Sequence, residues 1–225
     1  MIEIAHIRTD FPTKFGLPRQ SGLVDALKGT VVFAPKYRDP RAFRGLEGFS
    51  HIWLIWKFSE SVCEDWSPTV RPPRLGGNAT MGVFATRSPF RPNPIGLSCV
   101  KLESIEYDTP DGPVLHISGA DLMDGTPIYD VKPYLPYADS RPDATGGFAQ
   151  DVMDYGLEVV FPDEWLSLVP EDKREGLTGI LQQDPRPGYR RNDSRRFGIR
   201  FADMDVRFTV KDGVLTVCEV VKVEE

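Results

Sequence analysis

The chain has 225 residues, of which 40% are hydrophobic and 11% aromatic, so it can bury a core and intrinsic disorder is excluded. Its net charge of −6 disfavours a protein that coats nucleic acid nonspecifically, and its longest apolar stretch, FSHIWLIWKF, is too short to cross a bilayer. Residues 1–30 carry no secretory signal. The three cysteines are odd in number and lie far apart, which favours reduced thiols in the cytoplasm over disulfides or a zinc site.

The first 140 residues read as a series of short strands. β-branched and aromatic runs alternate with clusters of Gly, Pro, Asp and Asn. These runs lie at residues 2–7, 30–34, 50–58, 80–86, 97–107 and 114–120. Amphipathic helices do not alternate with them, which disfavours a doubly wound parallel sheet. The long Pro-rich connections favour a β-barrel or a strongly curved mixed sheet.

The pattern changes at residues 138–147, a polar and turn-rich segment that predicts a linker. Beyond it we expect one strand, two helices and a hairpin, at residues 158–161, 162–168, 170–185 and 204–223. Both helices open with Pro and acidic residues, and the hairpin turns at Asp212–Gly213. The chain is therefore predicted to be mainly β, with a barrel domain at 1–140 and a small α+β domain at 148–225.

Several familiar site signatures are absent from the sequence. It has no GxGxxG, no Walker loop, no HExxH array and no GxSxG elbow. A dinucleotide-binding fold, a P-loop enzyme and covalent catalysis are therefore disfavoured, and the scattered histidines predict no metal site.

The loop TRSPFRPNPIGLS (86–98) combines three prolines with Arg87 and Arg91. Each proline fixes its own φ and extends the residue before it, so the loop loses little entropy when a ligand docks. The arginines then suit a carboxylate, a phosphate or an electron-rich ring. The alternative, in which the prolines block edge pairing and the arginines are solvated, fits this loop equally well.

A second dense segment, ADLMDGTPIYDVKPYLPYAD (120–139), carries four aspartates and three tyrosines. Alone it reads slightly better as a turn with solvated carboxylates. Two such loops in one chain nevertheless favour a ligand cleft between them. A smaller cluster, FGLPRQSGL (15–23), places a Ser–Gly turn where backbone can approach a ligand closely.

Four segments together carry a resemblance to a known family: FGLPRQSGL, RGLEGFSHIWLIWKF, RPPRLGGNATMGVFATRSPFRPNPIGLS and DLMDGTPIYDVKPYLPYADS. Over about the first 150 residues, the chain closely resembles the TrmO (YaeB-like) tRNA methyltransferases. The later string DPRPGYRR and the closing hairpin also look like the C-terminal domain of that family.

The resemblance implies an enzyme dependent on S-adenosylmethionine, with a single-sheeted β-barrel catalytic domain and a homodimeric assembly. It implies methylation of N6 of threonylcarbamoyladenosine next to the anticodon of tRNA. Carried over by motif, the donor site would consist of Gln20, Ser21, Gly22, Glu60, Ser61, Arg91, Asp121, Leu122, Met123 and Asp124.

The acceptor nitrogen is bonded to a carbonyl, so its proton is unusually acidic and a nearby base would help. We expect Tyr129, Asp130 and Lys132 in that neighbourhood, with Asp130 as the candidate base. Two basic patches suit phosphate contacts, and a tyrosine in one of them suits base stacking. The predicted tRNA contacts are Arg87, Arg186, Tyr189, Arg190, Arg191, Arg195 and Arg196. The competing hypotheses are a non-catalytic β-barrel module for a nucleoside-like ligand or RNA, and a methyltransferase acting on another acceptor.

Overall fold

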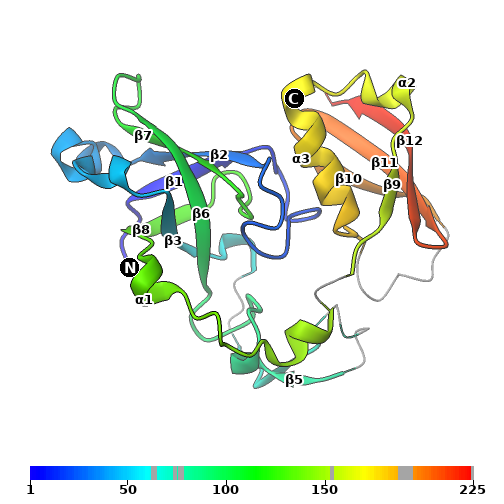
Figure 1. Cartoon of the computed structure of the whole chain (residues 1–225), viewed down its shortest axis with the longest axis horizontal. Helices are drawn as coiled ribbons and strands as arrows, with labels where there is room; N and C mark the ends of the chain where they lie inside the picture. Colours follow the sequence, from blue (N-terminus) through cyan, green and yellow to red (C-terminus); the bar gives the residue numbers. More distant parts are fainter. Residues whose placement is uncertain (62–64, 73–74, 76–78, 153–154, 187–194, 224–225) are drawn as a thin grey trace.

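The computed structural model describes residues 1–61, 65–72, 75, 79–152, 155–186 and 195–223. They form a closed six-stranded barrel and a separate four-stranded sheet (Figure 1). The barrel strands are β1 (Ala5–Thr9), β2 (Lys28–Phe33), β3 (His51–Lys57), β6 (Ile95–Glu106), β7 (Val114–Ser118) and β8 (Pro127–Pro133). The predicted fold class, a β-barrel followed by a small α+β unit, is confirmed.

The barrel runs in the order β1-β2-β7-β6-β3-β8, and its neighbouring strands are antiparallel. In β3, every second side chain is buried: Ile52, Leu54 and Trp56 face the barrel core. This alternation is the period of two expected of a strand with one face in a core.

Strand β8 closes the barrel, although the sequence predicted only a loop there. It pairs with β3 on one side and with β1 on the other. Pro127 and Pro133 stand at the two ends of the strand, where a missing N–H removes little of the ladder. The two prolines that obscured the strand in the sequence are therefore compatible with it.

The run at 80–86, predicted as a strand, is mostly not one. Only β5 (Met81–Gly82) is extended, paired with β4 (Thr69–Val70), and the 3-10 turn η6 (Val83–Ala85) follows. The Thr86 hydroxyl donates to the Val83 carbonyl at 2.9 Å, a local side-chain bond that competes with strand pairing.

Three 3-10 turns join β2 to β3: η1 (Pro35–Tyr37), η2 (Pro40–Phe43) and η3 (Leu46–Gly48). Proline begins the first two, where its fixed φ suits the first helical position. Phe43 is buried and packs edge-on against Phe33, with ring centroids 4.8 Å apart. The segment thereby covers the barrel end at which β2 stops.

The second sheet has the order β10-β11-β12-β9. Its strands are β9 (Glu158–Val160), β10 (Phe197–Phe201), β11 (Met204–Lys211) and β12 (Val214–Lys222). Between β8 and β9 lie the helix α1 (Pro136–Asp139) and the 3-10 turn η7 (Gly147–Val152). Between β9 and β10 lie the helices α2 (Asp163–Leu166) and α3 (Glu171–Gln182). The predicted hairpin turn is confirmed, because Asp212 and Gly213 both have positive φ.

The N-terminal segment between β1 and β2 packs into the core of this second sheet. Phe11 lies edge-on to Phe201 with centroids 5.5 Å apart, and Val24 and Leu27 join the same cluster. A Cβ at Gly179 of α3 would lie 2.5 Å from Val24, so glycine permits this close approach. Residues 10–27 are therefore held between the barrel and α3.

No helix among the described residues has the length and apolar character needed to cross a membrane.

Candidate functional site

Three of the loops singled out in the sequence meet at one end of the barrel. Strand β3 ends there at Lys57, β6 begins at Ile95, β7 ends at Ser118 and β8 begins at Pro127, as their registers show. The loop after β1, the proline loop before β6 and the aspartate loop before β8 thus share one rim. We call this the upstream rim.

Asp121 is the centre of the polar contacts on this rim. The Ser98 hydroxyl donates to Asp121 Oδ1 at 2.6 Å, and Trp56 Nε1–H donates to Ser98 Oγ at 2.9 Å. The backbone N–H of Ser21 also donates to the Asp121 carboxylate, and Ser21 Oγ accepts from the Cys99 N–H at 3.1 Å. One carboxylate therefore joins two loops to strand β6.

Burial raises the pKa of Asp121 to about 6, well above the ordinary value for an aspartate. Hydrogen bonds from Ser98 and from backbone N–H groups lower the pKa, as does the nearby charge of Arg87, but they offset the burial only in part. The Asp121 carboxylate therefore titrates close to neutrality and is mostly ionised above pH 7.

Arg87 belongs to this cluster. Its Nη1 donates to Oε1 of Gln20, and its charge acts on Asp121. The sequence assigned Arg87 to RNA and Arg91 to the donor site. In the structure, Arg91 Nη1 donates to the Thr86 carbonyl at 3.0 Å and so braces its own loop.

Gly96 allows the Trp56 indole to reach Ser98. A Cβ at position 96 would lie 2.2 Å from Cε2 of Trp56, a distance that no packed side chain tolerates. The indole therefore lies directly against the β6 backbone, with its N–H on Ser98.

The other residues of the predicted Asp121–Asp124 stretch serve the turn itself. Leu122 is fully buried in the barrel core. Asp124 Oδ1 accepts from the backbone N–H of Thr9 at 2.9 Å, and the Met123 carbonyl accepts from Thr126. These contacts fix the position from which Asp121 projects.

The remaining predicted donor residues also lie on loops near this rim. The Gly22 N–H donates to the Gly119 carbonyl at 2.9 Å. Glu60 and Ser61 belong to the 3-10 turn η4 (Ser59–Ser61), and Lys14 Nζ donates to the Glu60 carbonyl at 3.3 Å. Lys14 thereby joins this turn to the loop that carries Gln20.

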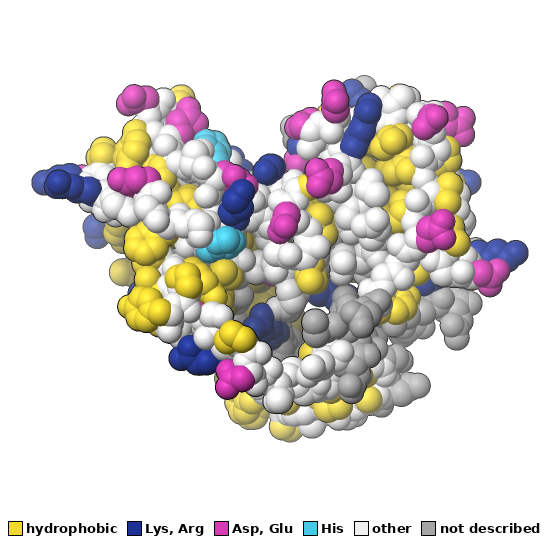
Figure 2. Space-filling model, in the orientation of Figure 1, with side chains coloured by type: hydrophobic (Ala, Val, Ile, Leu, Met, Phe, Trp, Pro, Cys, Tyr) yellow, Lys and Arg dark blue, Asp and Glu magenta, His cyan; other side chains and the backbone are white. Residues whose placement is uncertain are grey.

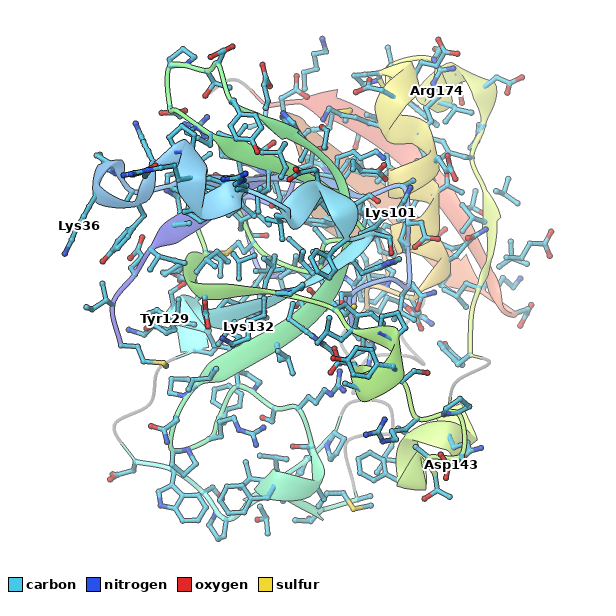
Figure 3. The ribbon with its side chains drawn as sticks, turned by 60° about the vertical axis from the view of Figure 1, so that its left-hand side comes forward. Lys36, Lys101, Tyr129, Lys132, Asp143 and Arg174 are labelled. Carbon is cyan, nitrogen blue, oxygen red and sulfur yellow. The ribbon has the colours of Figure 1, made fainter. Side chains whose placement is uncertain are left out.

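The three residues predicted for the acceptor lie along β8 on the barrel wall, where Figure 3 labels Tyr129 and Lys132. Lys132 Nζ lies 2.7 Å from Asp130 Oδ2, and both side chains are exposed. Within the described chain, no hydrogen bond or ion pair joins them to Asp121. No such contact therefore links this trio to the rim cluster in the described part of the chain.

The predicted tRNA contacts of the C-terminal unit differ in exposure. Arg186 is buried and its Nε lies 2.8 Å from Asp184 Oδ1, which favours a structural role. Arg195 is exposed, as is Arg196, which reaches Glu219 at 3.4 Å. Tyr189, Arg190 and Arg191 lie outside the described residues.

Sequence reasoning missed Ser98 and Trp56. The available signal was a hydroxyl at an inward-facing position of β6, between the buried residues Gly96 and Val100. A buried polar side chain needs a partner, which the sequence does not name. Among the described residues, no group of three or more His, Cys, Asp or Glu side chains is placed to hold a metal ion.

The barrel, the second sheet and the rim cluster together define a two-domain β-barrel protein. Its upstream rim offers a guanidinium, an amide and a partly buried carboxylate, a set suited to a small zwitterionic ligand. The chain belongs to the tRNA-methyltransferase O family: the family's N-terminal domain model matches residues 6–140 and its C-terminal domain model matches residues 155–223. The family predicted from the motifs is confirmed.

Individual relatives agree over nearly the whole length. The chain is 44% identical over 218 residues to the tRNA (adenine(37)-N6)-methyltransferase of Escherichia coli, covering 93% of this chain and 92% of that one. It is 41% identical over 213 residues to a putative S-adenosylmethionine-dependent methyltransferase of Pseudomonas aeruginosa, covering 91% and 90%. A crystal structure of TrmO from Pseudomonas aeruginosa superposes with a TM-score of 0.78 at 35% identity, covering 97% of each chain.

Proposed function

We propose that this protein transfers the methyl group of S-adenosylmethionine to N6 of adenine 37 in tRNA, where that adenine already carries a threonylcarbamoyl group. The observation that carries the proposal is the 44% identity to the Escherichia coli enzyme over 93% of the chain. The relatives named as methyltransferases also match both units of this chain, so a non-catalytic binding module is not favoured.

The residues of the upstream rim fit the methyl donor chemically. S-adenosylmethionine has a carboxylate, an ammonium group and ribose hydroxyls, and when bound it supplies an electrophilic methyl group. Arg87 can bind the carboxylate, and Gln20 offers an amide for polar edges. Asp121, which Ser98 holds in place, lies in the same cluster and is left for the acceptor.

The remaining residues carried over by motif are assigned to the same site. They shape the loops around Asp121, chiefly through backbone contacts: Ser21, Gly22, Glu60, Ser61, Arg91, Leu122, Met123 and Asp124. Positioning of the reactants, rather than covalent chemistry, is what such a preorganised set of loops contributes.

We place removal of the N6 proton at Asp121 rather than at Asp130. Asp121 lies in the donor cluster, and with a pKa of about 6 it is ionised at neutral pH yet basic enough to accept an acidic proton. Asp130 is engaged with Lys132. We assign Asp130, Tyr129 and Lys132 to contacts with the tRNA along the barrel wall.

The two units divide the work, with residues 1–140 carrying the methyl transfer and residues 148–225 contacting tRNA. Arg195 and Arg196, exposed immediately before β10, suit phosphate contacts. The buried Arg186–Asp184 pair instead holds the chain where it leaves α3. Because the patch is local on an acidic protein, tRNA binding should weaken with salt with a modest slope.

We further propose a cytoplasmic homodimer that uses the outer face of β3 and β6. Opposite the core-facing residues, this face carries Trp53 and Ile55 on β3, while Ile95 and Leu97 on β6 are 37% and 51% exposed. Tyr137 of α1 is 84% exposed beside it. Figure 2 shows hydrophobic side chains gathered on this side of the barrel. An apolar patch of this kind is typical of a subunit interface.

The direct test is a methyl-transfer assay with labelled donor. The acceptors are tRNA from a strain that lacks the modification and tRNA without the threonylcarbamoyl group. Nucleoside mass spectrometry should find one added methyl on threonylcarbamoyladenosine in the first tRNA and none in the second. A failure to methylate the first tRNA would refute the proposed function.

A further inference from the structure

The motif RGLEGFSH (44–51) takes no part in the upstream rim. At the other end of the barrel, β1 begins at Ala5, β2 ends at Phe33 and β8 ends at Pro133. A cavity of about 570 Å³ lies there, between the barrel and the segment that joins β2 to β3. Arg44, Gly45, Leu46 and Phe49 of the motif line this downstream cavity.

Four of the twelve residues that line the downstream cavity are aromatic. Phe33 and Phe43 are buried and lie against each other edge-on, while Tyr37 and Phe49 are partly buried. Asp130 of β8 lines the same cavity. Aromatic faces with a polar acceptor at the side suit a flat heterocycle such as a nucleobase, since every base offers a π-face and polar edges.

Two basic side chains near the cavity, Arg44 and Lys36, have no carboxylate partner among the described residues. Arg44 is exposed, and it forms no ion pair with any residue that the structure describes. Lys36 extends outward from the same segment (Figure 3), and its Nζ lies 5.6 Å from the Tyr37 ring centroid. Arg41, in contrast, is engaged by Asp39 at 2.5 Å. Arg44 and Lys36 are thus available to an anion.

We propose that the downstream cavity binds one unpaired nucleotide of the substrate tRNA, with its base against Tyr37 and Phe49 and its phosphate on Arg44. The inference rests on the proposed function, because tRNA is the macromolecule that it brings to the barrel. The lining of the cavity includes none of the rim residues Gln20, Ser98 and Asp121, which the proposed function assigns to the methyl donor. The bound nucleotide is therefore not the target adenosine but a second point of contact.

This second contact would orient the tRNA relative to the donor site. A phosphate contact fixes register, whereas a stacked base that must be unpaired selects a loop over a duplex. The cavity would therefore favour tRNA whose loop can present an unpaired nucleotide here while the target adenosine lies at the donor site. Asp130 lies at the edge of the cavity, with its carboxylate paired to Lys132 at 2.7 Å.

The test compares Arg44→Gln with Arg41→Gln, a matched control from the same segment whose side chain is engaged by Asp39. For Arg44→Gln we expect about a tenfold higher Kd for tRNA, a higher KM, an unchanged donor Kd and a salt slope smaller by about one. Arg41→Gln should match the wild type in all four. Tyr37→Ala should weaken tRNA binding by about tenfold, since stacking is lost, and Tyr37→Phe should restore it.

A photocrosslinking experiment locates the contact directly. Anticodon stem-loops with 4-thiouridine at successive loop positions are irradiated with the enzyme, and the labelled peptide is identified. Label on residues 35–49 at one loop position supports the inference. If the wild type methylates tRNA while this peptide is unlabelled and Arg44→Gln binds tRNA normally, the inference is overturned and the proposed function stands. A change of oligomeric state in Arg44→Gln, seen by light scattering with tRNA binding intact, would assign the cavity to a subunit contact instead.

Discussion

Ser98 donates its hydroxyl to Asp121 Oδ1 at 2.6 Å, from a strand position with no exposed surface. The contact joins residues 23 positions apart in the sequence and sets both the direction and the charge of the Asp121 carboxylate. Because Trp56 donates to the same hydroxyl, the rotamer of Ser98 is constrained from both sides. The chemistry of the rim therefore depends on a side chain inside the barrel.

Removing the Ser98 hydroxyl should move the pH dependence of methyl transfer. The hydrogen bond from Ser98 lowers the pKa of Asp121, so Ser98→Ala should raise that pKa above about 6. The ascending limb of the activity profile should then shift to higher pH by about one unit, since a hydrogen bond to a charged group contributes roughly 1.5–3 kcal/mol. Single-turnover rates between pH 5 and pH 9 measure the shift.

Ser118→Ala is the matched control for this profile. Ser118 is also buried in the barrel, and its hydroxyl donates at 2.6 Å to a different carboxylate, that of Glu103. In the control variant, the ascending limb of the pH–activity profile should stay at the wild-type pH. If the ascending limbs of Ser98→Ala and the wild type lie at the same pH, the ionisation of Asp121 does not govern the reaction.

Asp121 should also make stability depend on pH in a defined direction. Its pKa is raised in the folded state, so between about pH 4 and pH 6 the folded protein binds more protons than the unfolded chain. The free energy of unfolding should therefore fall as pH rises through this window, by roughly 1–3 kcal/mol from this group. In Asp121→Asn, the free energy of unfolding should no longer fall over this pH window, and methyl transfer should be lost. Urea unfolding at pH 4.5 and pH 7.5 tests this, and an equally steep decrease in the variant would contradict it.

The sequence predicted the rim loops but not the contacts that join them. Strand alternation marks Ser98 as inward-facing, yet its partner follows from barrel closure, which pairs β3 with both β6 and β8. Strand β8 itself was obscured by Pro127 and Pro133, because single-residue propensity does not reveal that both stand at strand ends. Register and closure are long-range properties that local patterns do not encode.

Residues 10–27 show a second limit of sequence reasoning. Val24 and Leu27 have no strand or helix period around them, so nothing local indicates that they pack on α3. Likewise, Arg87 and Arg91 are indistinguishable in the loop TRSPFRP. Only the fold places one beside Gln20 and turns the other back to the Thr86 carbonyl.

Those two arginines should separate donor binding from loop stability. Arg87→Lys should raise the Kd for S-adenosylmethionine by about tenfold or more, because lysine lacks the planar fork of the guanidinium. Arg91→Lys should change the donor Kd by less than about threefold and lower the melting temperature instead, since its contact is with the Thr86 carbonyl. Calorimetric titration and thermal unfolding of both variants measure the difference. If Arg91→Lys raised the Kd for S-adenosylmethionine more than Arg87→Lys, Arg91 would be the residue that contacts the donor.

Gly96→Ala should disrupt the Trp56–Ser98 contact. The added Cβ would lie 2.2 Å from the indole, so Trp56 must rotate away, at a cost of about 1–3 kcal/mol. Gly48→Ala is the control, because a Cβ there meets nothing within 4 Å and the glycine has an ordinary negative φ. In Gly96→Ala we expect a melting temperature several degrees lower, a shifted maximum of tryptophan emission and weaker donor binding. Gly48→Ala should show none of these changes. Unchanged emission in Gly96→Ala would mean that the backbone yields instead of the indole.

The ion pair between Asp10 and Lys173 should couple the two units. Lys173 Nζ of α3 lies 2.6 Å from both carboxylate oxygens of Asp10, and each side chain is a little over one quarter exposed. Because the loop that carries Gln20 and Ser21 begins beside Asp10, loss of the pair should loosen the donor site as well as the domain contact.

A double-mutant cycle of Asp10→Asn and Lys173→Met, measured by urea unfolding, should give a coupling free energy of about 1 kcal/mol. Both single variants should weaken donor binding by a few-fold, whereas Lys211→Met, at the end of β11 in the second sheet, should not. Additive effects in the cycle, with donor affinity unchanged, would show that the two units hold the loop without this pair.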